Sequence, residues 1–276
     1  IMSDKGTERI KNCFMNLKRA EKTGLITFVT AGDPTLEISA DILSQLPQAG
    51  ADIIEIGMPF SDPMADGPAI QASSLRALKN GTNCSKILKM VEKFREQDDI
   101  TPIILMGYFN PIYIYGVEKF VVDASRAGVD GFIIVDLPPE ETEVRIPVED
   151  AGLSLIYLTS PTTHNQRVPD VVKNASGFIY HVSVLGITGT TAPSNKNIEK
   201  DLNRIRSYTD LPIAVGFGIK TPEQAREISA YADAVVVGSA FVNKISECLD
   251  IDGKIIDDCV VSVVDLVKDI KRGLNN

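Results

Sequence analysis

The 276-residue sequence contains no tryptophan and only two histidines, His164 and His181. Two histidines are too few for a multi-histidine metal site, and we therefore expect no metal ion in this chain. His164 lies in a polar loop, which is typical of a surface residue. His181 alternates with Tyr180 along a predicted strand, so its ring should face the other side of that strand and have a structural role.

Cysteine and lysine are missing from the positions where covalent catalysis would need them. The four cysteines, Cys13, Cys84, Cys248 and Cys259, are scattered, and no Cys-x-x-Cys pair occurs. This distribution argues against a disulfide framework, and the lack of cysteine at the predicted strand ends excludes a thiol nucleophile. No lysine lies within a predicted strand, which argues against a Schiff-base aldolase. General acid–base chemistry by carboxylates remains.

Long apolar runs and basic clusters are absent as well. No run approaches the roughly 20 residues of a membrane span. A net charge of -9 without a basic patch argues against a nucleic-acid surface. The first residues have neither the apolar segment of a signal peptide nor an Arg/Ser-rich transit pattern. We expect a cytoplasmic protein, or a plastid protein if a transit peptide was removed before residue 1.

Eight short apolar runs recur along the chain, with amphipathic stretches between most of them. Apolar runs that alternate with helices indicate parallel strands buried on both faces, and eight such units predict a (β/α)8 TIM barrel. No linker interrupts them, so we expect a single domain over residues 1–276. The alternative is a doubly wound open sheet, but no Gly-x-Gly-x-x-Gly follows the first strand. The predicted strands cover residues 25–30, 53–56, 103–106, 132–135, 155–158, 178–182, 213–215 and 234–237.

Helical periodicity is clearest at the two ends of the chain. Residues 7–22 carry Ile10, Cys13, Phe14 and Leu17 on one face, which predicts an extra N-terminal helix with Thr7 as its N-cap. Because this helix precedes the first strand, we expect it to cover the bottom of the barrel. Further helices are predicted within the barrel units and at the C-terminal end, at residues 35–46, 85–95, 117–126, 221–230 and 260–270.

A carboxylate in the second strand is the most informative residue of the chain. Glu55 lies within an apolar, β-branched run, and a buried carboxylate without a partner costs several kcal/mol, so its presence needs a reason. The loop that follows is rich in proline and glycine and carries Asp62 and Asp66. We expect Glu55 to have a raised pKa and Asp66 to stay ionised, as in a two-carboxylate active site. An ion-paired core glutamate beside an ordinary turn is the alternative.

Glycines at the ends of the last strands indicate a phosphate site. Gly216 and Gly218 follow the seventh strand, Gly238 and Ser239 follow the eighth, and a further glycine loop follows the sixth. In (β/α)8 barrels, phosphate groups commonly bind to the loops after strands seven and eight. The same glycines could instead form tight turns between strands and helices.

Other polar and apolar residues fall at the strand ends, where this architecture places its active site. The apolar ones could line a pocket for a flat hydrophobic group or simply fill the barrel core, and the sequence does not separate these possibilities. The polar residues are Asp33, Tyr108, Asn110, Asp136, Thr159, Ser160, Tyr180 and Ser183, and the apolar residues are Phe28, Met106, Ile133, Val135, Leu158 and Phe217.

With these features together, the chain resembles the tryptophan synthase alpha chain family from Phe28 to Ala240. The family's signature is glutamate, an apolar residue and glycine, followed by Pro-Phe-Ser-Asp-Pro-x-Ala-Asp-Gly-Pro, and it stands here without a break from Glu55 to Pro68. Residues 105–111, 136–138 and 215–219 also match the family's pattern. The motif is long, so the resemblance is specific.

The resemblance implies a lyase that cleaves indole-3-glycerol phosphate to indole and glyceraldehyde 3-phosphate. It implies that Glu55 is the general acid–base, that Asp66 holds the indole nitrogen and stabilises an indolenine cation, and that Tyr180 lies beside the substrate. The implied substrate pocket comprises Phe28, Met106, Tyr108, Ile133, Thr188 and Phe217, and the implied phosphate-binding residues are Gly189, Gly218, Gly238 and Ser239.

The resemblance also implies a partner. A beta chain that carries pyridoxal phosphate would bind at Pro59 and Asp62 in an alpha2-beta2 heterotetramer, and the present chain would need no cofactor. One departure is visible, because Val184 stands where many relatives carry arginine. Three alternatives stay open: a self-sufficient lyase that releases free indole, a purely regulatory subunit, and another phosphate-binding barrel such as a sugar-phosphate isomerase.

Overall fold

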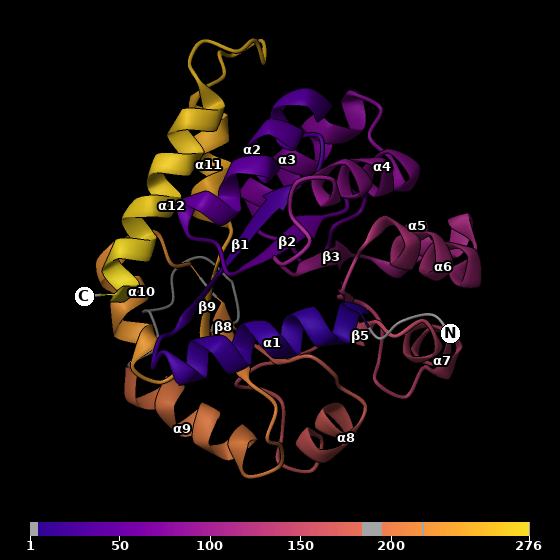
Figure 1. The fold of residues 1–276 in the computed structure, drawn as a ribbon, viewed down its shortest axis with the longest axis vertical. Coiled ribbons are helices and arrows are strands. Elements are labelled where there is room, and N and C mark those ends of the chain that lie inside the picture. Colours follow the sequence, from indigo (N-terminus) through magenta and orange to yellow (C-terminus); the bar gives the residue numbers. More distant parts are fainter. Residues whose placement is uncertain (1–4, 184–194, 217, 276) are drawn as a thin grey trace.

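Parallel strands surrounded by helices form the centre of the molecule (Figure 1). The structure, a computed structural model, describes residues 5–183, 195–216 and 218–275. Each pair of neighbouring strands runs in parallel, as continuous apolar runs predict. The strands are β1 (Gly24–Thr30), β2 (Ile53–Gly57), β3 (Ile103–Gly107), β4 (Gly131–Ile134), β5 (Ser154–Leu155), β6 (Tyr157–Thr159), β7 (Ile179–Val182), β8 (Ile213–Gly216) and β9 (Ala234–Val237).

The nine strands correspond to the eight predicted runs because the fifth run is divided. β5 and β6 are separated by Ile156, whose N–H donates to the carbonyl of Phe132 at 2.9 Å. The sheet order is β5-β4-β3-β2-β1-β9-β8-β7-β6, so its two ends belong to one continuous segment of chain. A single predicted strand over residues 155–158 was therefore wrong in detail, but the (β/α)8 barrel is confirmed.

Alternation along the strands separates the inside of the barrel from the outside. Phe28 on β1 lies opposite Glu55 on β2, and Glu55 lies opposite Ile104 on β3. Their side chains therefore point to the same, inner face. The lower part of this interior is filled by buried apolar side chains of Ile26, Ile53, Ile104, Ile133, Ile156, Phe178, Ala214, Ala234 and Val236.

The helices begin where the sequence provides side-chain caps. The side chains of Thr35, Asn83 and Thr221 each accept a hydrogen bond from a backbone N–H in the first turn, which satisfies a group that the helix itself cannot. The helices are α1 (Lys5–Arg19), α2 (Leu36–Ala49), α3 (Pro68–Lys79), α4 (Cys84–Arg95), α5 (Phe109–Tyr115), α6 (Val117–Ala127), α7 (Thr142–Asp150), α8 (Val168–Lys173), α9 (Asn195–Arg206), α10 (Pro222–Ser229), α11 (Ser239–Glu247) and α12 (Cys259–Asn275).

Helix α1 covers the N-terminal end of the barrel, as predicted, and crosses in front of the strands in Figure 1. Its side chains Ile10, Phe14 and Leu17 pack on the interior residues of the strands. Thr7 is not its N-cap: the helix already includes Lys5, and the Thr7 hydroxyl donates instead to the carbonyl of Gly152 at 3.0 Å. The hydroxyl therefore donates a tertiary hydrogen bond instead of accepting one from the first turn of the helix.

A buried ion-pair cluster joins α1 to this end of the barrel. Asp130, whose side chain is fully buried, accepts hydrogen bonds from Arg9 at 2.9 Å and from Arg95 and the Ile103 N–H at 2.7 Å. Burial, the largest effect, raises the pKa of Asp130 to about 6, although both arginines oppose it. The cluster belongs to the face of a (β/α)8 barrel that serves stability rather than catalysis.

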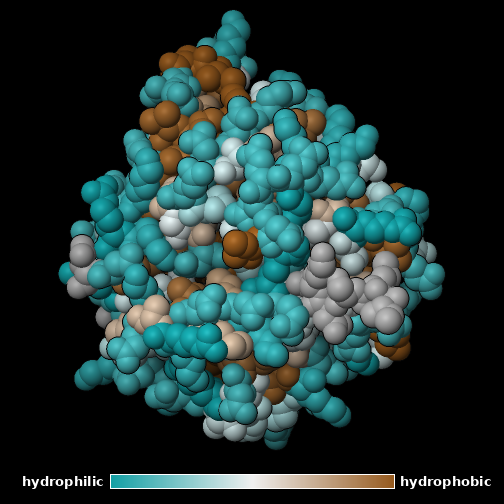
Figure 2. Space-filling model, viewed as in Figure 1, coloured by the Kyte–Doolittle hydropathy of each residue, from teal (hydrophilic) through white to brown (hydrophobic). Residues whose placement is uncertain are grey.

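The face drawn in Figure 2 is mostly hydrophilic. Hydrophobic side chains gather at its upper left, over the connection between α11 and α12, where Ile251, Ile255 and Ile256 are exposed. Within the described ranges, none of the helices combines the length and apolar character that a membrane span requires.

The packing of α1 predicts a large cost for Phe14→Ala. The Phe14 side chain is 7% exposed and its ring lies 5.7 Å from that of Phe178. Removing it leaves a cavity, so we expect the free energy of unfolding in urea to fall by about 3–5 kcal/mol. The adjacent Met15 is 38% exposed, and Met15→Ala should change stability by less than about 0.5 kcal/mol. Equal losses in the two variants would contradict the packing of α1 on the barrel.

Candidate active site

Glu55 is a fully buried carboxylate inside the barrel. Among the described residues, neither of its carboxyl oxygens has a hydrogen-bond partner. Burial raises its pKa to about 8, because removing a carboxylate from water disfavours the charged form. Its strand neighbours Phe28 and Ile104 are apolar. Glu55 is therefore mainly protonated at neutral pH and can donate a proton.

Asp66 is held above the strands by Tyr108. The Tyr108 hydroxyl accepts from the Ala65 N–H at 2.9 Å and donates to Oδ2 of Asp66 at 3.2 Å. The Tyr108 ring is buried and lies 5.4 Å from the ring of Phe60 on the same loop. One tyrosine at the end of β3 thus contacts the loop at three positions. Burial raises the pKa of Asp66, and the hydrogen bond from Tyr108 opposes this rise.

Tyr180 lies near both acids. Its side chain stands at the mouth of the barrel, partly exposed, and burial raises its pKa well above the ordinary value. The negative charges of Glu55 and Asp66 add to this rise, so Tyr180 lies close enough to feel both carboxylates. Gly216 leaves room for the ring, because a Cβ at this position would collide with the Tyr180 hydroxyl.

Apolar side chains line the space beside the carboxylates. The Phe28 ring fills the space beside Gly57 and Gly238, since a Cβ at either glycine would lie within 3.1 Å or less of a Phe28 side-chain atom. Met106 is partly exposed at the end of β3, whereas Ile133 is fully buried among the interior residues. Phe28 and Met106 can therefore contact a ligand, and Ile133 contributes mainly to the core below it.

The phosphate-site residues that the structure describes lie at the ends of β8 and β9. Gly238 precedes α11 and Ser239 is its first residue, so the first N–H groups of this helix have no acceptor within it. Gly218 is exposed and has a φ of 58°, which favours glycine. Predictions on Thr188, Gly189 and Phe217, like the departure at Val184, lie outside the described residues.

Comparison with known proteins identifies the family. The family model described as tryptophan synthase alpha chain matches residues 14–271. This chain belongs to that family. Its members are lyases of tryptophan biosynthesis.

Solved structures agree with this membership. Tryptophan synthase subunit alpha from Legionella pneumophila str. Paris is 39% identical, with 97% of this chain and 98% of that chain covered and a TM-score of 0.89. A structure from Aquifex aeolicus VF5 is 37% identical over 96% and 98% of the two chains, with a TM-score of 0.86. Tryptophan synthase from Mycobacterium tuberculosis is 30% identical over 97% and 98%, with a TM-score of 0.86.

The loop that carries the family signature has one exposed acid and one buried proline. Asp62 is exposed and accepts a hydrogen bond from the Ser61 hydroxyl, whereas Pro59 is buried within the chain. Of the two residues predicted to meet a partner, Asp62 therefore offers side-chain surface and Pro59 does not. Pro59 instead stiffens the beginning of the loop.

Sequence reasoning missed Arg76, which lies on α3 just beyond the signature. Its guanidinium binds both carboxylate oxygens of the buried Asp33, at 2.7 and 2.8 Å. The sequence marks Asp33 as a polar residue after the first strand, but it does not indicate which residue pairs with it. The signal that could have found Arg76 is the need of a buried aspartate for a cation.

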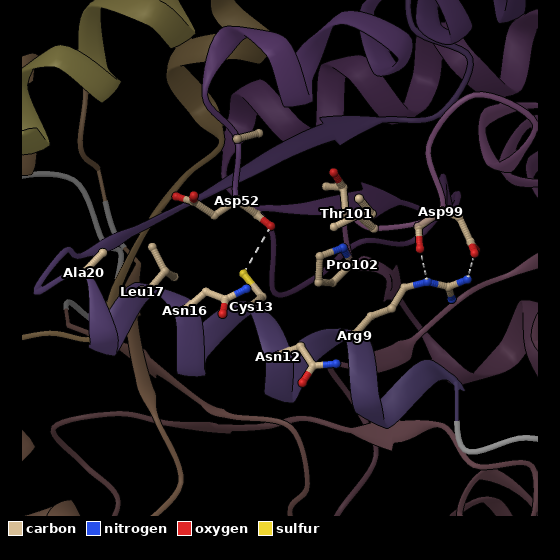
Figure 3. Close-up of a pocket in the computed structure, with 12 residues that line it drawn as sticks. Arg9, Asn12, Cys13, Asn16, Leu17, Ala20, Asp52, Asp99, Thr101 and Pro102 are labelled. Carbon is tan, nitrogen blue, oxygen red and sulfur yellow. Dashed lines mark hydrogen bonds and ion pairs between the residues drawn. The ribbon is translucent and has the colours of Figure 1, made fainter.

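A hollow of about 460 Å³ at the other end of the barrel carries none of the predicted site residues (Figure 3). It lies between α1 and the segments that precede β2 and β3, with Arg9 bonded to Asp99 on one side and Cys13 to the carbonyl of Asp52 on the other. In the parts of the chain that the structure describes, three or more histidine, cysteine, aspartate and glutamate side chains nowhere gather as a metal site would require.

The raised pKa of Glu55 predicts a pH-dependent stability difference. Between the unfolded value of 4.5 and the folded value of about 8, the folded state keeps a proton that the unfolded state has lost. The contribution of Glu55 to stability therefore falls as pH rises through this window. Glu55→Gln removes the effect, so we expect it to be more stable than wild type at pH 9 by a few kcal/mol, one pKa unit being about 1.4 kcal/mol.

Urea denaturation at several pH values measures this difference, which should shrink towards pH 5. The exposed Glu118 on α6 gives a matched control, and Glu118→Gln should stay within about 0.5 kcal/mol of wild type at every pH. A Glu55→Gln difference that is constant with pH would show that the carboxyl of Glu55 is not held protonated.

Proposed function

We propose that this chain cleaves indole-3-glycerol phosphate to indole and glyceraldehyde 3-phosphate, with Glu55 as general acid–base and Asp66 as the group that stabilises the cation. The observation that carries the proposal is the buried Glu55 carboxyl with a pKa of about 8 beneath a second, loop-borne carboxylate. Such a pair provides a proton donor and a fixed negative charge in one site.

The reaction needs a proton donor first. Protonation of the indole carbon that bears the glycerol phosphate chain makes an indolenine cation. The hydroxyl on the adjacent side-chain carbon then loses its proton, the carbon–carbon bond breaks, and its electrons return to the ring. Glu55 starts protonated, donates to the ring carbon, and as a carboxylate can take up the hydroxyl proton.

Asp66 stabilises the charge that develops. A carboxylate beside the ring nitrogen offsets the positive charge of the indolenine, and the interaction is stronger because the site is partly shielded from water. The hydrogen bond from Tyr108 at 3.2 Å fixes the orientation of the Asp66 carboxylate before the substrate arrives. Tyr180, close to both acids, would pack beside the reacting bond.

The phosphate group of the substrate would bind at the ends of β8 and β9. The first N–H groups of α11, which begins at Ser239, have no acceptor within the helix, Gly238 and Gly218 let the backbone approach the anion, and Gly189 completes the phosphate site in this proposal, with Thr188 in the adjoining substrate pocket. Phe28, Met106 and Phe217 would contact the flat indole ring. Binding energy from the phosphate orients the reacting bond over Glu55.

The proposal includes a beta-chain partner that carries pyridoxal phosphate and consumes the indole in an alpha2-beta2 heterotetramer. Exposed Asp62 lies on the loop that ends at Asp66, so docking and catalysis would share one segment. The described strands form one sheet, which supports a single domain over residues 1–276. The self-sufficient lyase would use the same residues without a partner.

Replacement of the two acids tests the chemistry. Glu55→Gln cannot give and recover a proton, and Asp66→Asn leaves the indolenine charge unbalanced, so each should lower kcat for indole release about 10²–10⁴-fold. Affinity for glycerol phosphate, measured by calorimetry, should stay within about threefold, because neither acid lies at the phosphate end. More than a tenth of wild-type kcat in Glu55→Gln would remove it from the mechanism.

Replacement of Asp62 tests the partner. Titration with a beta chain should raise indole formation at least about tenfold, a coupling of about 1.4 kcal/mol. Asp62→Ala should weaken this activation and leave the basal rate nearly unchanged, because its side chain points to solvent. An isolated chain already at full rate, or an Asp62→Ala variant activated as well as wild type, would favour the self-sufficient lyase.

A further inference from the structure

Helix α3, which directly follows the loop that carries Asp66, buries no large apolar side chain completely. Its buried residues are the small side chains Ser73, Ser74 and Ala77, while Ile70 and Leu78 are only partly buried and Leu75 is exposed. The next helix, α4, is different, because it buries Ile87, Leu88, Met90, Val91 and Phe94. Packing of large apolar side chains normally determines where a helix lies on a barrel. For α3 such apolar packing contributes little to the position of the helix.

Polar contacts hold α3 instead. The Ser73 and Thr30 hydroxyls are 2.6 Å apart, Arg76 binds both oxygens of Asp33, and the Asn80 side-chain amide donates to the carbonyl of residue 34. Positions 73, 76 and 80 lie on one face of the helix. Their partners all lie between residues 30 and 34, at the end of β1. The contacts therefore form a ladder that sets both the position and the rotation of α3.

The beginning of α3 lies next to Asp66. Gly67 is the N-cap of the helix and Pro68 its first residue, so only Gly67 lies between Asp66 and the helix in the sequence. The Gln71 side-chain amide also donates to the backbone carbonyl of Asp66 at 2.9 Å. A rotation or shift of α3 must therefore move the backbone that carries the Asp66 carboxylate.

Arg76 additionally reaches the helix at the phosphate side of the site. Its Nη1 lies 3.5 Å from the Ser246 hydroxyl on α11, the helix that begins at Ser239. This α3 side chain thus contacts both the segment that follows β1 and helix α11. The bidentate fork to Asp33 fixes its plane, which a lysine could not do.

The net contribution of this ion pair to stability is expected to be small. The Asp33 side chain is fully buried, and burial raises its pKa while the hydrogen bonds and charge of Arg76 lower it. The desolvation cost of such a pair largely offsets the attraction, so apolar residues of similar volume can be as stable. A buried pair of this kind can instead specify one geometry.

We propose that Asp33 and Arg76 are positioning residues that hold α3, and through it the Asp66 carboxylate, relative to Glu55 and the phosphate end of α11. The inference rests on the proposed function of Asp66. The pair does not touch the reacting atoms, and its effect on the rate is transmitted by the helix.

Two substitutions test this with a matched control. Asp33→Asn removes the charge and Arg76→Lys removes the fork, while both keep much of the side-chain volume. The controls are Asp130→Asn and Arg95→Lys in the buried pair at the other end of the barrel. We expect kcat for indole release by the full chain to fall at least about tenfold in the first two variants with KM within about threefold, and to stay within about twofold of wild type in the controls.

A structural readout separates this inference from the assignment of Asp66. The chain has no tryptophan, and Met64 on the loop is 87% exposed, so Met64→Trp gives a single fluorescent reporter two residues from Asp66. We expect Asp33→Asn and Arg76→Lys to change the anisotropy and acrylamide quenching of this reporter, and Asp130→Asn and Arg95→Lys to leave both unchanged.

The outcomes are distinct. A changed reporter with lowered kcat supports the positioning role. An unchanged reporter, or a loss of kcat that merely follows the loss of thermal stability in both pairs, overturns it. A changed reporter with normal kcat also overturns it, and if Asp66→Asn is then fully active, the proposed function itself has failed. If Asp33→Asn does not fold, Arg76→Lys carries the test alone.

Discussion

The burial of one carboxyl group, to which the described residues offer no hydrogen bond, is the constraint on which this structure depends. Glu55 lies in the middle of β2, inside a barrel whose other residues at that level are largely apolar, and its pKa of about 8 follows from desolvation. Such a group weakens the fold at neutral and alkaline pH. The barrel tolerates it because the apolar layers below Glu55 and around the outside of the sheet are continuous. Stability is supplied by those layers, which leaves the mouth free for chemistry.

The two ends of the barrel treat buried acids in opposite ways. Asp130 at the N-terminal end accepts hydrogen bonds from two arginines and a backbone N–H, and its pKa rises only to about 6. Glu55 near the C-terminal end has no such donor among the described residues, and its pKa rises further. Burial alone therefore does not distinguish the proposed acid–base group from a structural carboxylate. The difference lies in whether the surrounding chain satisfies the carboxylate or leaves it to a substrate.

Much of this could be predicted from the sequence, for a physical reason. Strand burial is encoded in local apolar runs, and Glu55 stands out because it interrupts one. The strand positions and the helix predicted to begin near residue 35 depend on such local patterns. Whether a polar side chain forms its hydrogen bonds with nearby or with distant residues does not depend on local patterns. Thr7 donates to Gly152 rather than capping α1, and Arg76 joins Asp33 across 43 positions of sequence. Neither pairing can be predicted from the residues that are adjacent to it in the sequence.

The same distinction explains why the loop that carries Asp66 needs support from outside its own sequence. Prolines limit the shapes available to residues 58–67, but they do not fix where the loop stands over the barrel. Tyr108, which directly follows β3, holds one side of it through Ala65 and Asp66. Helix α3 holds the other side, and that helix is attached to the end of β1 by polar contacts rather than by an apolar face. The position of Asp66 is thus set by residues at the ends of β1 and β3, the two strands that flank β2. Because Glu55 lies on β2, both acids are positioned by the same part of the sheet.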